Sequence, residues 1–423
     1  MNATGLQCLR CGAQYPVSMN SSDCPRCRDT GRSNLTVVYG DKLRSAHRIP
    51  ATSDRASMWR IDAMLPVACA EAVTLGEGRT PLLPLPSVAS KLGIDAVYGK
   101  DESRNPTGSF KDRLASSAIS SARALGARVI ASSSSGNAGA SAAAYAARAG
   151  MPCIVFTFEG TVGAMVTQMR AYGAMVISTR TKADRWKFLE HGVRELGWFP
   201  TSPFFSPAVG SNPLGIEGYK TIAYEIAESL DWRVPDWCVL PVCYGDALIG
   251  MWKGFQEMLS WGWIDRAPRM VAAEIYGSLG AALNNKLSTP PAMPRPYDTV
   301  AVSIGAVQST YQALDVVRKS GGTAVSVTDQ DILRWQERLA TQEGIYAEPA
   351  AAAPAAALEH LRRQGTIRPA DSVVLLLTAS GLKDPETTSR VLGEISRAQA
   401  DFQSVLRILE EDERFAAACL PAT

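Results

Sequence analysis

The sequence predicts a multi-domain α/β protein, and three observations lead to this fold class. The chain has 423 residues, which is enough for two or three domains of roughly 150 residues each. Hydrophobic residues make up 46% and charged residues 20% of the chain, a balance typical of globular proteins. From residue 96 onward, short apolar runs alternate with amphipathic or Ala-rich segments. This alternation indicates βαβ units, with parallel sheets that carry helices on both faces.

The elements of the alternating region follow from its apolar runs and their period. The expected strands are Ala96–Tyr98, Val129–Ala131, Cys153–Phe158, Met175–Ile177, Trp237–Val242, Met270–Glu274 and Ser372–Leu377. The expected helices are Lys111–Leu125, Ala138–Ala149, Val162–Tyr172, Tyr219–Leu230 and Leu248–Trp261. We also expect a buried helix to start in Ala350–Ala357, although Pro354 interrupts that run.

The charge balance argues against two classes of partner. With 43 basic and 41 acidic side chains the net charge is +2, so no strong basic field is present to attract nucleic acid or an anionic membrane surface. No apolar run approaches the roughly 20 residues of a membrane helix, and Met1–Gly12 lacks the apolar core of a secretory signal. We therefore expect a cytoplasmic protein with no nucleic-acid or membrane partner.

Four of the nine cysteines form two Cys-x-x-Cys pairs near the N-terminus. Cys8, Cys11, Cys24 and Cys27 have the spacing of a tetrahedral Zn²⁺ site, in which each pair supplies two thiolates from one tight turn. Such a site leaves no open position, so the zinc would be structural. The alternatives are two reduced pairs without metal, or a redox pair. The redox pair is disfavoured because neither pair follows a strand and opens a long helix.

Lys111 follows the polar loop Lys100–Phe110, and a helix is expected to begin at this lysine. A lysine has a reference pKa near 10.4, so it needs burial or a cationic neighbour to act as an amine nucleophile. Burial at a helix start meets this need and also suits binding of an anion nearby. Taken alone, the loop leaves an ordinary surface lysine as the alternative.

Three further segments follow expected strands, at the sheet edge where open α/β folds bind ligands. Ser132–Ser141 contains four consecutive serines and then Gly-Asn, which is more than a helix cap needs and suits a carboxylate. Tyr244–Gly250 opens a helix and suits a phosphate on backbone amides, although it lacks the Gly-Lys-Ser/Thr of a Walker loop. Thr378–Asp384 places hydroxyl groups after the last strand.

Taken together, these segments resemble the threonine synthases, which belong to the tryptophan-synthase-β type (fold type II) of pyridoxal-phosphate enzymes. The lysine loop Asn105–Arg113 carries the resemblance, and further motifs follow in the family's order. These motifs are Gly76–Leu82, Ser135–Asn137, Ser320–Gly322, Glu348–Ala350 and Gly381–Asp384. The resemblance implies a two-domain fold type II α/β enzyme with parallel sheets, plus a small N-terminal zinc ribbon. We expect the ribbon at 1–33, a large cofactor-binding domain at 34–115 and 205–400, a small α/β domain at 116–204 and a C-terminal helical tail at 401–423.

The resemblance also implies a role for each site residue. Lys111 would hold pyridoxal 5′-phosphate as a Schiff base and move the proton at the substrate's Cα. Phe110 would flank the cofactor ring, Asn137 would bond its 3′-oxygen and Thr378 would face its pyridine nitrogen. The substrate carboxylate would bind to Ser134, Ser135 and Gly136. The cofactor phosphate would bind to the backbone of Gly245, Asp246, Ala247, Leu248, Ile249 and Gly250.

Two departures from the family pattern bear on ligand binding. Cys243 and Tyr244 replace the glycine and asparagine that usually begin the phosphate loop, and Asp246 would bring a carboxylate close to the phosphate. Gly215 stands where threonine synthases carry an arginine that would grip a substrate phosphate. Arg79 and Lys220 remain as candidate substitutes for that arginine.

The expected activity is that of a pyridoxal-phosphate-dependent lyase acting on a small amino acid by β- or γ-elimination or replacement. The leading reaction is the conversion of O-phosphohomoserine to threonine and phosphate. A serine/threonine dehydratase or a β-replacement synthase acting on another substrate is the alternative within this class. A non-catalytic regulatory protein on the same scaffold is the alternative from another class, and retention of Lys111 argues against it. We also expect a homodimer.

Overall fold

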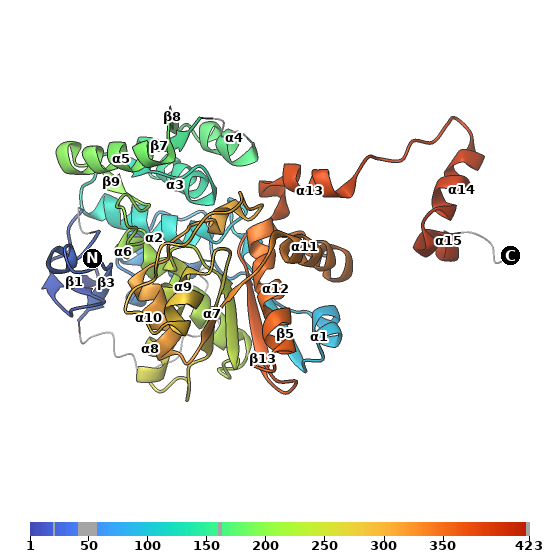
Figure 1. The fold of residues 1–423 in the computed structure, drawn as a ribbon. Coiled ribbons are helices and arrows are strands. Elements are labelled where there is room, and N and C mark those ends of the chain that lie inside the picture. Colours follow the sequence, from blue (N-terminus) through green and yellow to red (C-terminus); the bar gives the residue numbers. More distant parts are fainter. Residues whose placement is uncertain (20–21, 41–56, 160–162, 420–423) are drawn as a thin grey trace. The chain divides into compact units, whose positions relative to one another are not determined.

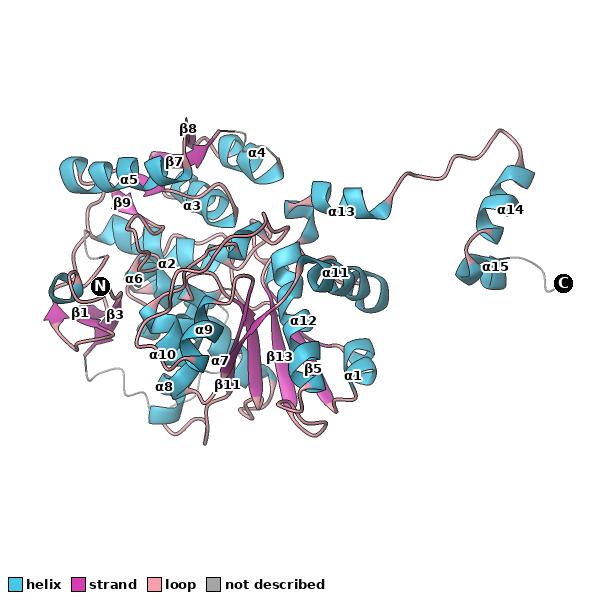
Figure 2. Cartoon of the chain, viewed as in Figure 1, coloured by secondary structure: helices cyan, strands magenta, loops and turns pink. Residues whose placement is uncertain are grey.

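The computed structural model describes residues 1–19, 22–40, 57–159 and 163–419. The chain forms two compact units, Met1–Asp384 and a C-terminal unit that begins at Pro385. The first unit contains three sheets (Figures 1 and 2). The second contains α13 (Pro385–Leu392), α14 (Phe402–Glu410) and α15 (Glu413–Cys419). The domain boundaries expected from the sequence stay predictions.

The largest sheet has six strands in the order β12-β11-β10-β13-β5-β4. All neighbours are parallel except β4, which pairs antiparallel with β5 at one edge. The strands are β4 (Leu82–Pro84), β5 (Ala96–Asp101), β10 (Trp237–Pro241), β11 (Arg269–Glu274), β12 (Thr323–Ser326) and β13 (Ser372–Leu377). The non-sequential order places β13 between β5 and β10, so that segments distant in sequence end at the same sheet edge.

Helices cover both faces of this sheet, and alternate strand residues point to opposite faces. Val239 and Leu375 pack in the cluster of α12, whereas their neighbours Leu240 and Leu376 pack in the cluster of α8 and α10. One face carries α1 (Pro86–Leu92), α11 (Asp329–Glu343) and α12 (Pro349–Arg363). The other carries α7 (Lys220–Ser229), α8 (Asp246–Ser260), α9 (Ser278–Asn284) and α10 (Tyr311–Lys319). The expected Ala-rich helix is α12, which continues through Pro354.

The second sheet has four parallel strands in the order β8-β7-β6-β9. They are β6 (Ile130–Ser132), β7 (Cys153–Phe158), β8 (Met175–Thr179) and β9 (Phe199–Pro200). The helices of this layer are α3 (Asn137–Arg148), α4 (Ala164–Ala171) and α5 (Lys182–Leu196). Helix α2 (Lys111–Ala124) contacts both α3 and α6 (Pro213–Ile216), and so joins this layer to the rest of the unit. The expected helix start at Val162 lies outside the described residues.

The N-terminal segment forms a small antiparallel sheet in the order β2-β1-β3. Its strands are β1 (Ala3–Cys8), β2 (Gln14–Tyr15) and β3 (Leu35–Tyr39). The hydrogen bonds that attach it to the larger part of the unit include those from Asn34 Nδ2 to the Ser211 carbonyl (3.0 Å), from Lys253 Nζ to the Val37 carbonyl (2.7 Å) and from the Tyr39 hydroxyl to Glu217 (2.7 Å). Among the described residues, no helix has the length and apolar character needed to cross a membrane.

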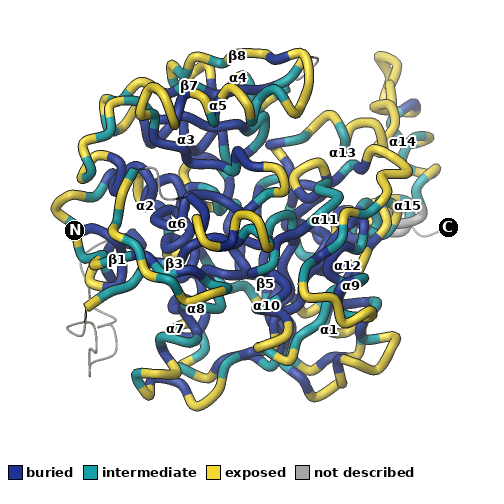
Figure 3. The backbone as a smooth tube through the Cα atoms, turned by 60° about the vertical axis from the view of Figure 1, so that its left-hand side comes forward, coloured by how far each residue is buried: buried dark blue, intermediate teal, exposed yellow. Residues whose placement is uncertain are grey.

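A buried network of charges holds the centre of the first unit together. Figure 3 shows how much of the backbone of this unit belongs to buried residues. The Arg113 guanidinium, on α2, donates to Glu102 Oε2 (2.7 Å) and to both carboxylate oxygens of Glu225 on α7 (2.7 Å each). Lys100 Nζ, on β5, donates to Glu225 (2.7 Å) and to the Thr80 carbonyl (2.6 Å). Burial alone would raise the pKa of Glu225, but the charges of Arg113 and Lys100 hold it well below its usual range.

Replacing Arg113 with leucine is expected to cost about 3–5 kcal/mol of unfolding free energy, because Glu102 and Glu225 would then be buried without their counter-charge. Denaturant unfolding monitored by circular dichroism measures the loss. Arg104→Leu is the matched control, because Arg104 pairs with Asp101 (2.9 Å) while 69% of its side chain is exposed, and its loss should stay below about 1 kcal/mol. Equal losses for the two variants would show that the buried network is not what stabilises the centre.

Candidate active site and metal centre

Hydrogen bonds among neighbouring polar residues fix the conformation of the loop before Lys111. Asp112 accepts from the Thr107 amide (2.7 Å) and from the Thr107 hydroxyl (2.6 Å), while Asn105 Nδ2 donates to the Glu102 carbonyl (2.8 Å). Gly108 has φ +82°, a conformation that favours glycine. Burial raises the pKa of Asp112 to about 6, against the opposing effect of the hydrogen bonds that it accepts. The loop therefore reaches the start of α2 in one fixed conformation.

Lys111 is the first residue of α2, and aromatic rings surround its amine. The Nζ atom lies 4.5 Å from the centroid of the Phe110 ring and 5.5 Å from that of Tyr219. No described residue forms an ion pair with it. Burial lowers the pKa of Lys111, and the charges of Asp246, Cys243 and Glu348 offset only part of that effect. The environment thus favours the neutral amine that covalent chemistry requires.

The end of β13 runs directly beside this lysine. The Phe110 amide donates to the Thr378 carbonyl (2.9 Å), and the Ser380 amide donates to the Gly108 carbonyl (3.0 Å). Ser109 and Ala379 form a β-bridge between these two hydrogen bonds. The backbone of Thr378 is therefore fixed next to Phe110, and its role at the cofactor ring stays a prediction.

The serine-rich segment leads into the start of α3. Gly136 is the N-cap of α3, and the Ser134 hydroxyl accepts from the Gly136 amide (3.3 Å). Helix N-termini offer backbone N–H groups without intrahelical partners, which suit a carboxylate. The residues expected to bind the substrate carboxylate, Ser134, Ser135 and Gly136, therefore lie together at one helix end.

Asn137, which follows them, pairs with a carboxyl group that the sequence did not single out as a site residue. Its Nδ2 donates to Glu348 Oε2 (2.9 Å), while its Oδ1 is buried with no partner among the described residues. Burial raises the pKa of Glu348, with partial compensation from the Asn137 hydrogen bond and the charge of Lys383. Only its place in the Glu348–Ala350 motif could have indicated this residue. The unpartnered Asn137 oxygen is an atom that a bound cofactor or substrate would satisfy.

The proposed phosphate loop begins at Gly245, which adopts φ +84° and caps α8. The Asp246 carboxylate accepts from the Ser211 amide (3.1 Å) and the Ser211 hydroxyl (2.7 Å). Its hydrogen bonds are thus made with the segment before α6. The Ile249 amide donates to the Gly245 carbonyl (2.9 Å) within the helix. The amides of Ile249 and Gly250 are therefore used within the helix. The amides that remain for a phosphate are those of Gly245, Asp246, Ala247 and Leu248.

The structure shows the surroundings of Gly215 and of Lys220 and Arg79, the two candidate substitutes for the missing arginine. Gly215 packs on α2, where a Cβ would lie 3.0 Å from Leu114 Cγ and 3.1 Å from Ala118 Cβ, so an arginine here would disturb that packing. Lys220 is fully buried and pairs with Glu217 (2.9 Å) and Glu257 (3.0 Å), so it is not available to a substrate. Arg79 is exposed.

A basic residue that sequence reasoning missed is Lys383, in the Gly381–Asp384 motif. Its Nζ donates to the Thr107 carbonyl (3.0 Å) and to the side chain of Gln168 on α4. Burial lowers the pKa of Lys383, with opposing effects from the charges of Glu348 and Asp112. Lys383 thereby connects the Lys111 loop and the end of β13 to the helical layer of the second sheet.

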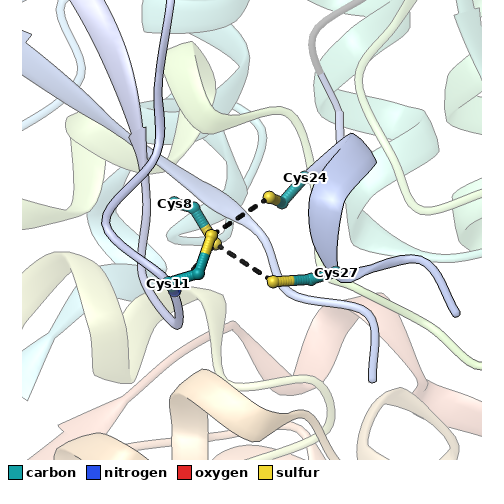
Figure 4. A group of neighbouring side chains, drawn as sticks. All are labelled: Cys8, Cys11, Cys24 and Cys27. Atoms are coloured by element: carbon teal, nitrogen blue, oxygen red, sulfur yellow. Dashed lines mark hydrogen bonds between the residues drawn. The ribbon is translucent and has the colours of Figure 1, made fainter. Parts of the chain in front are cut away.

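The four N-terminal cysteines converge as predicted (Figure 4). Their sulfur atoms all lie within 4.8 Å of one another, with 3.8 Å between Cys8 and Cys27 and 3.6 Å between Cys11 and Cys24. Zinc–sulfur bonds of about 2.3 Å in a tetrahedron require sulfur atoms about 3.8 Å apart. The Arg10 and Cys11 amides donate to the Cys8 sulfur (3.3 and 3.4 Å), which suits a thiolate ligand. The donor set therefore fits a structural zinc ion.

Three comparisons relate the chain to known proteins. The family model of pyridoxal-phosphate dependent enzymes matches residues 73–379. The threonine synthase of Methanosarcina acetivorans is 36% identical over 404 residues, covering 95% of this chain and 97% of the relative. That of Methanocaldococcus jannaschii is 34% identical over 410 residues, covering 96% and 99%.

Solved structures show the same fold. Maize serine racemase superposes with a TM-score of 0.62 at 20% identity, covering 79% of this chain and 93% of that one. A pyridoxal 5′-phosphate-dependent aspartate racemase gives a TM-score of 0.60 at 24% identity, covering 71% and 90%.

Protein purified without added zinc is expected to contain about one zinc per chain, measured by elemental analysis. Removing the metal should lower the stability of residues 1–40 because the ion supplies folding energy that this small sheet lacks. It should leave the environment of Lys111 unchanged, which the visible absorbance of the purified protein reports. Less than about a tenth of an equivalent of zinc, with four freely titratable thiols, would contradict the assignment.

Proposed function

Because the chain belongs to the pyridoxal-phosphate-dependent enzymes and is threonine synthase-like, we propose that it converts O-phosphohomoserine and water to threonine and phosphate. The observation that carries this proposal is the amine of Lys111, which lies beside the rings of Phe110 and Tyr219 and whose pKa is lowered by desolvation. Thr378, the Asn137–Glu348 pair and the first turn of α8 are fixed around it. The similarity to threonine synthases over nearly the whole chain supports the choice of substrate.

The residues fit the cofactor, and each has a defined task toward it. Pyridoxal phosphate, when bound, withdraws electrons from the substrate's Cα and so makes its proton removable. Lys111 would hold the cofactor covalently and, once displaced by the substrate's amine, move the proton at Cα. Asn137 would bind the ring's oxygen substituent through its side chain, and Thr378 would place a neutral hydroxyl at the ring nitrogen. The amides at the start of α8 would bind the phosphate.

The substrate would be bound mainly through its carboxylate, by Ser134, Ser135 and the amides at the start of α3. The aromatic rings beside Lys111 would limit the access of water to the reacting atoms. Lys383 joins the Lys111 loop to the helical layer of the second sheet through its hydrogen bonds to Thr107 and Gln168. Protons would leave Cα and Cβ, and departure of phosphate would break the bond between Cγ and the ester oxygen. Cγ would then take up a proton to become the methyl group, water would give its hydroxyl to Cβ, and Cα would regain a proton.

A second candidate function is elimination from an amino acid that carries no phosphate. The observation in its favour is that Gly215 packs on α2 and Lys220 is buried in an ion pair. Neither position therefore replaces the arginine that would bind a substrate phosphate. In that case serine or threonine would release ammonia, or a β-substituted serine would exchange its substituent. The cytoplasmic location and the homodimer expected from the sequence stay predictions.

A product assay distinguishes these activities. The wild-type enzyme is expected to form threonine and phosphate in equal amounts from O-phosphohomoserine, with kcat/KM exceeding that for serine, threonine and acetylserine. Lys111→Ala should lose at least about 100-fold in kcat because the proton-transferring amine is gone. Lys187→Ala, which removes a lysine whose side chain is 75% exposed, is the matched control and should behave as wild type. Ammonia from serine or threonine without phosphate release from phosphohomoserine would contradict the proposal and identify a dehydratase.

A further inference from the structure

Tyr219 is a fully buried residue that packs directly against the reactive lysine. It ends the short helix η6 (Glu217–Tyr219), just before α7, and none of its surface is exposed. Its ring centroid lies 5.1 Å from that of Phe110, and Lys111 Nζ lies 5.5 Å from the Tyr219 ring. The tyrosine therefore forms one wall of the space around the amine.

The hydroxyl of Tyr219 has no hydrogen-bond partner among the described residues. Other buried tyrosines in this part of the chain are paired. The Tyr145 hydroxyl donates to Glu77 (2.7 Å), and the Tyr224 hydroxyl donates to Glu257. A buried hydroxyl without a partner lowers stability, so this one is not explained by packing. A phenylalanine would fill the same space without that cost.

Tyr219 also adjoins the start of α8. A Cβ added to Gly250 would lie 2.6 Å from Tyr219 Cβ, so the helix approaches this residue as closely as a glycine permits. Burial, with the charges of Asp246, Glu102 and Asp112, raises the pKa of Tyr219 well above its ordinary value. The hydroxyl thus stays protonated and can donate. Of the neighbouring charges, that of Asp246, the first residue of α8, affects the hydroxyl most, so the hydroxyl faces the helix start that would hold the cofactor phosphate.

We propose that Tyr219 is a cofactor-binding residue whose hydroxyl donates a hydrogen bond to the phosphate group of the bound cofactor. This inference rests on the proposed function. It adds an uncharged donor from η6 to the amides at the start of α8, where Asp246 already places a carboxylate.

The test compares two aldehydes in Tyr219→Phe. The cofactor is removed from the purified enzyme with hydroxylamine, and the apo-protein is titrated with pyridoxal phosphate or with pyridoxal, which lacks the phosphate. The visible absorbance of the lysine adduct reports binding. Affinity for pyridoxal phosphate should fall about 10- to 100-fold, as for loss of a hydrogen bond to a charged group, while that for pyridoxal stays unchanged. The thermal stability of the apo-protein should stay equal or rise.

Tyr224→Phe is the matched control, because it removes a buried hydroxyl that is paired with Glu257. It should lower the stability of the apo-protein and leave the affinity for pyridoxal phosphate unchanged. Unchanged affinity for both aldehydes in Tyr219→Phe, or an equal loss for both, would overturn the assignment to the phosphate. Failure of the wild-type protein to form the adduct would instead overturn the proposed function on which the inference rests.

Discussion

The pairing of Arg113 with Glu102 and Glu225 is the interaction on which the site depends, because it joins elements that are far apart in sequence. Lys100, on β5, completes the balance with a second positive charge. The two positive and two negative groups are buried together, and each would be costly alone. The network fixes α2 relative to β5 and α7. Residues of the two glycine-containing motifs, Gly76–Leu82 and Asn105–Arg113, meet here, with the Thr80 hydroxyl accepting from Arg113 (3.2 Å).

This anchoring explains how one loop can serve both the core and the chemistry. Lys111 and Arg113 are two residues apart on α2, so their side chains leave the helix on different sides. Arg113 enters the charge network, while Lys111 points into aromatic surroundings that favour its neutral form. The first turn of α2 therefore places the charge network on one side of the helix and the desolvated amine on the other.

Much of this arrangement could be predicted because it is local in sequence. The apolar runs located the main strands, the Cys-x-x-Cys pairs located the thiol cluster, and the Asn105–Arg113 motif located Lys111. Pairings made only in the folded chain could not be found in this way. Glu348 is 211 positions from Asn137, and only the order of the strands brings them together.

Other features of the site could not be seen in the sequence for a similar reason. Lys220 looked available for a substrate because Glu257, which pairs with it together with the nearby Glu217, faces it only after α7 packs on α8. Ile249 and Gly250 were expected to offer amides, but the helix begins early enough to use them. Tyr219 carried no local signal, since its significance lies in an unpaired hydroxyl beside a residue more than a hundred positions away.

Mapping the lysine that carries the cofactor tests the central claim most directly. The purified holoenzyme is reduced with borohydride, digested and analysed by mass spectrometry. The desolvated amine beside Phe110 predicts a pyridoxyl mass on the peptide that contains Lys111 and on no other. An adduct on Lys100, Lys220, Lys253 or Lys383, with an unmodified Lys111 peptide, would contradict the account.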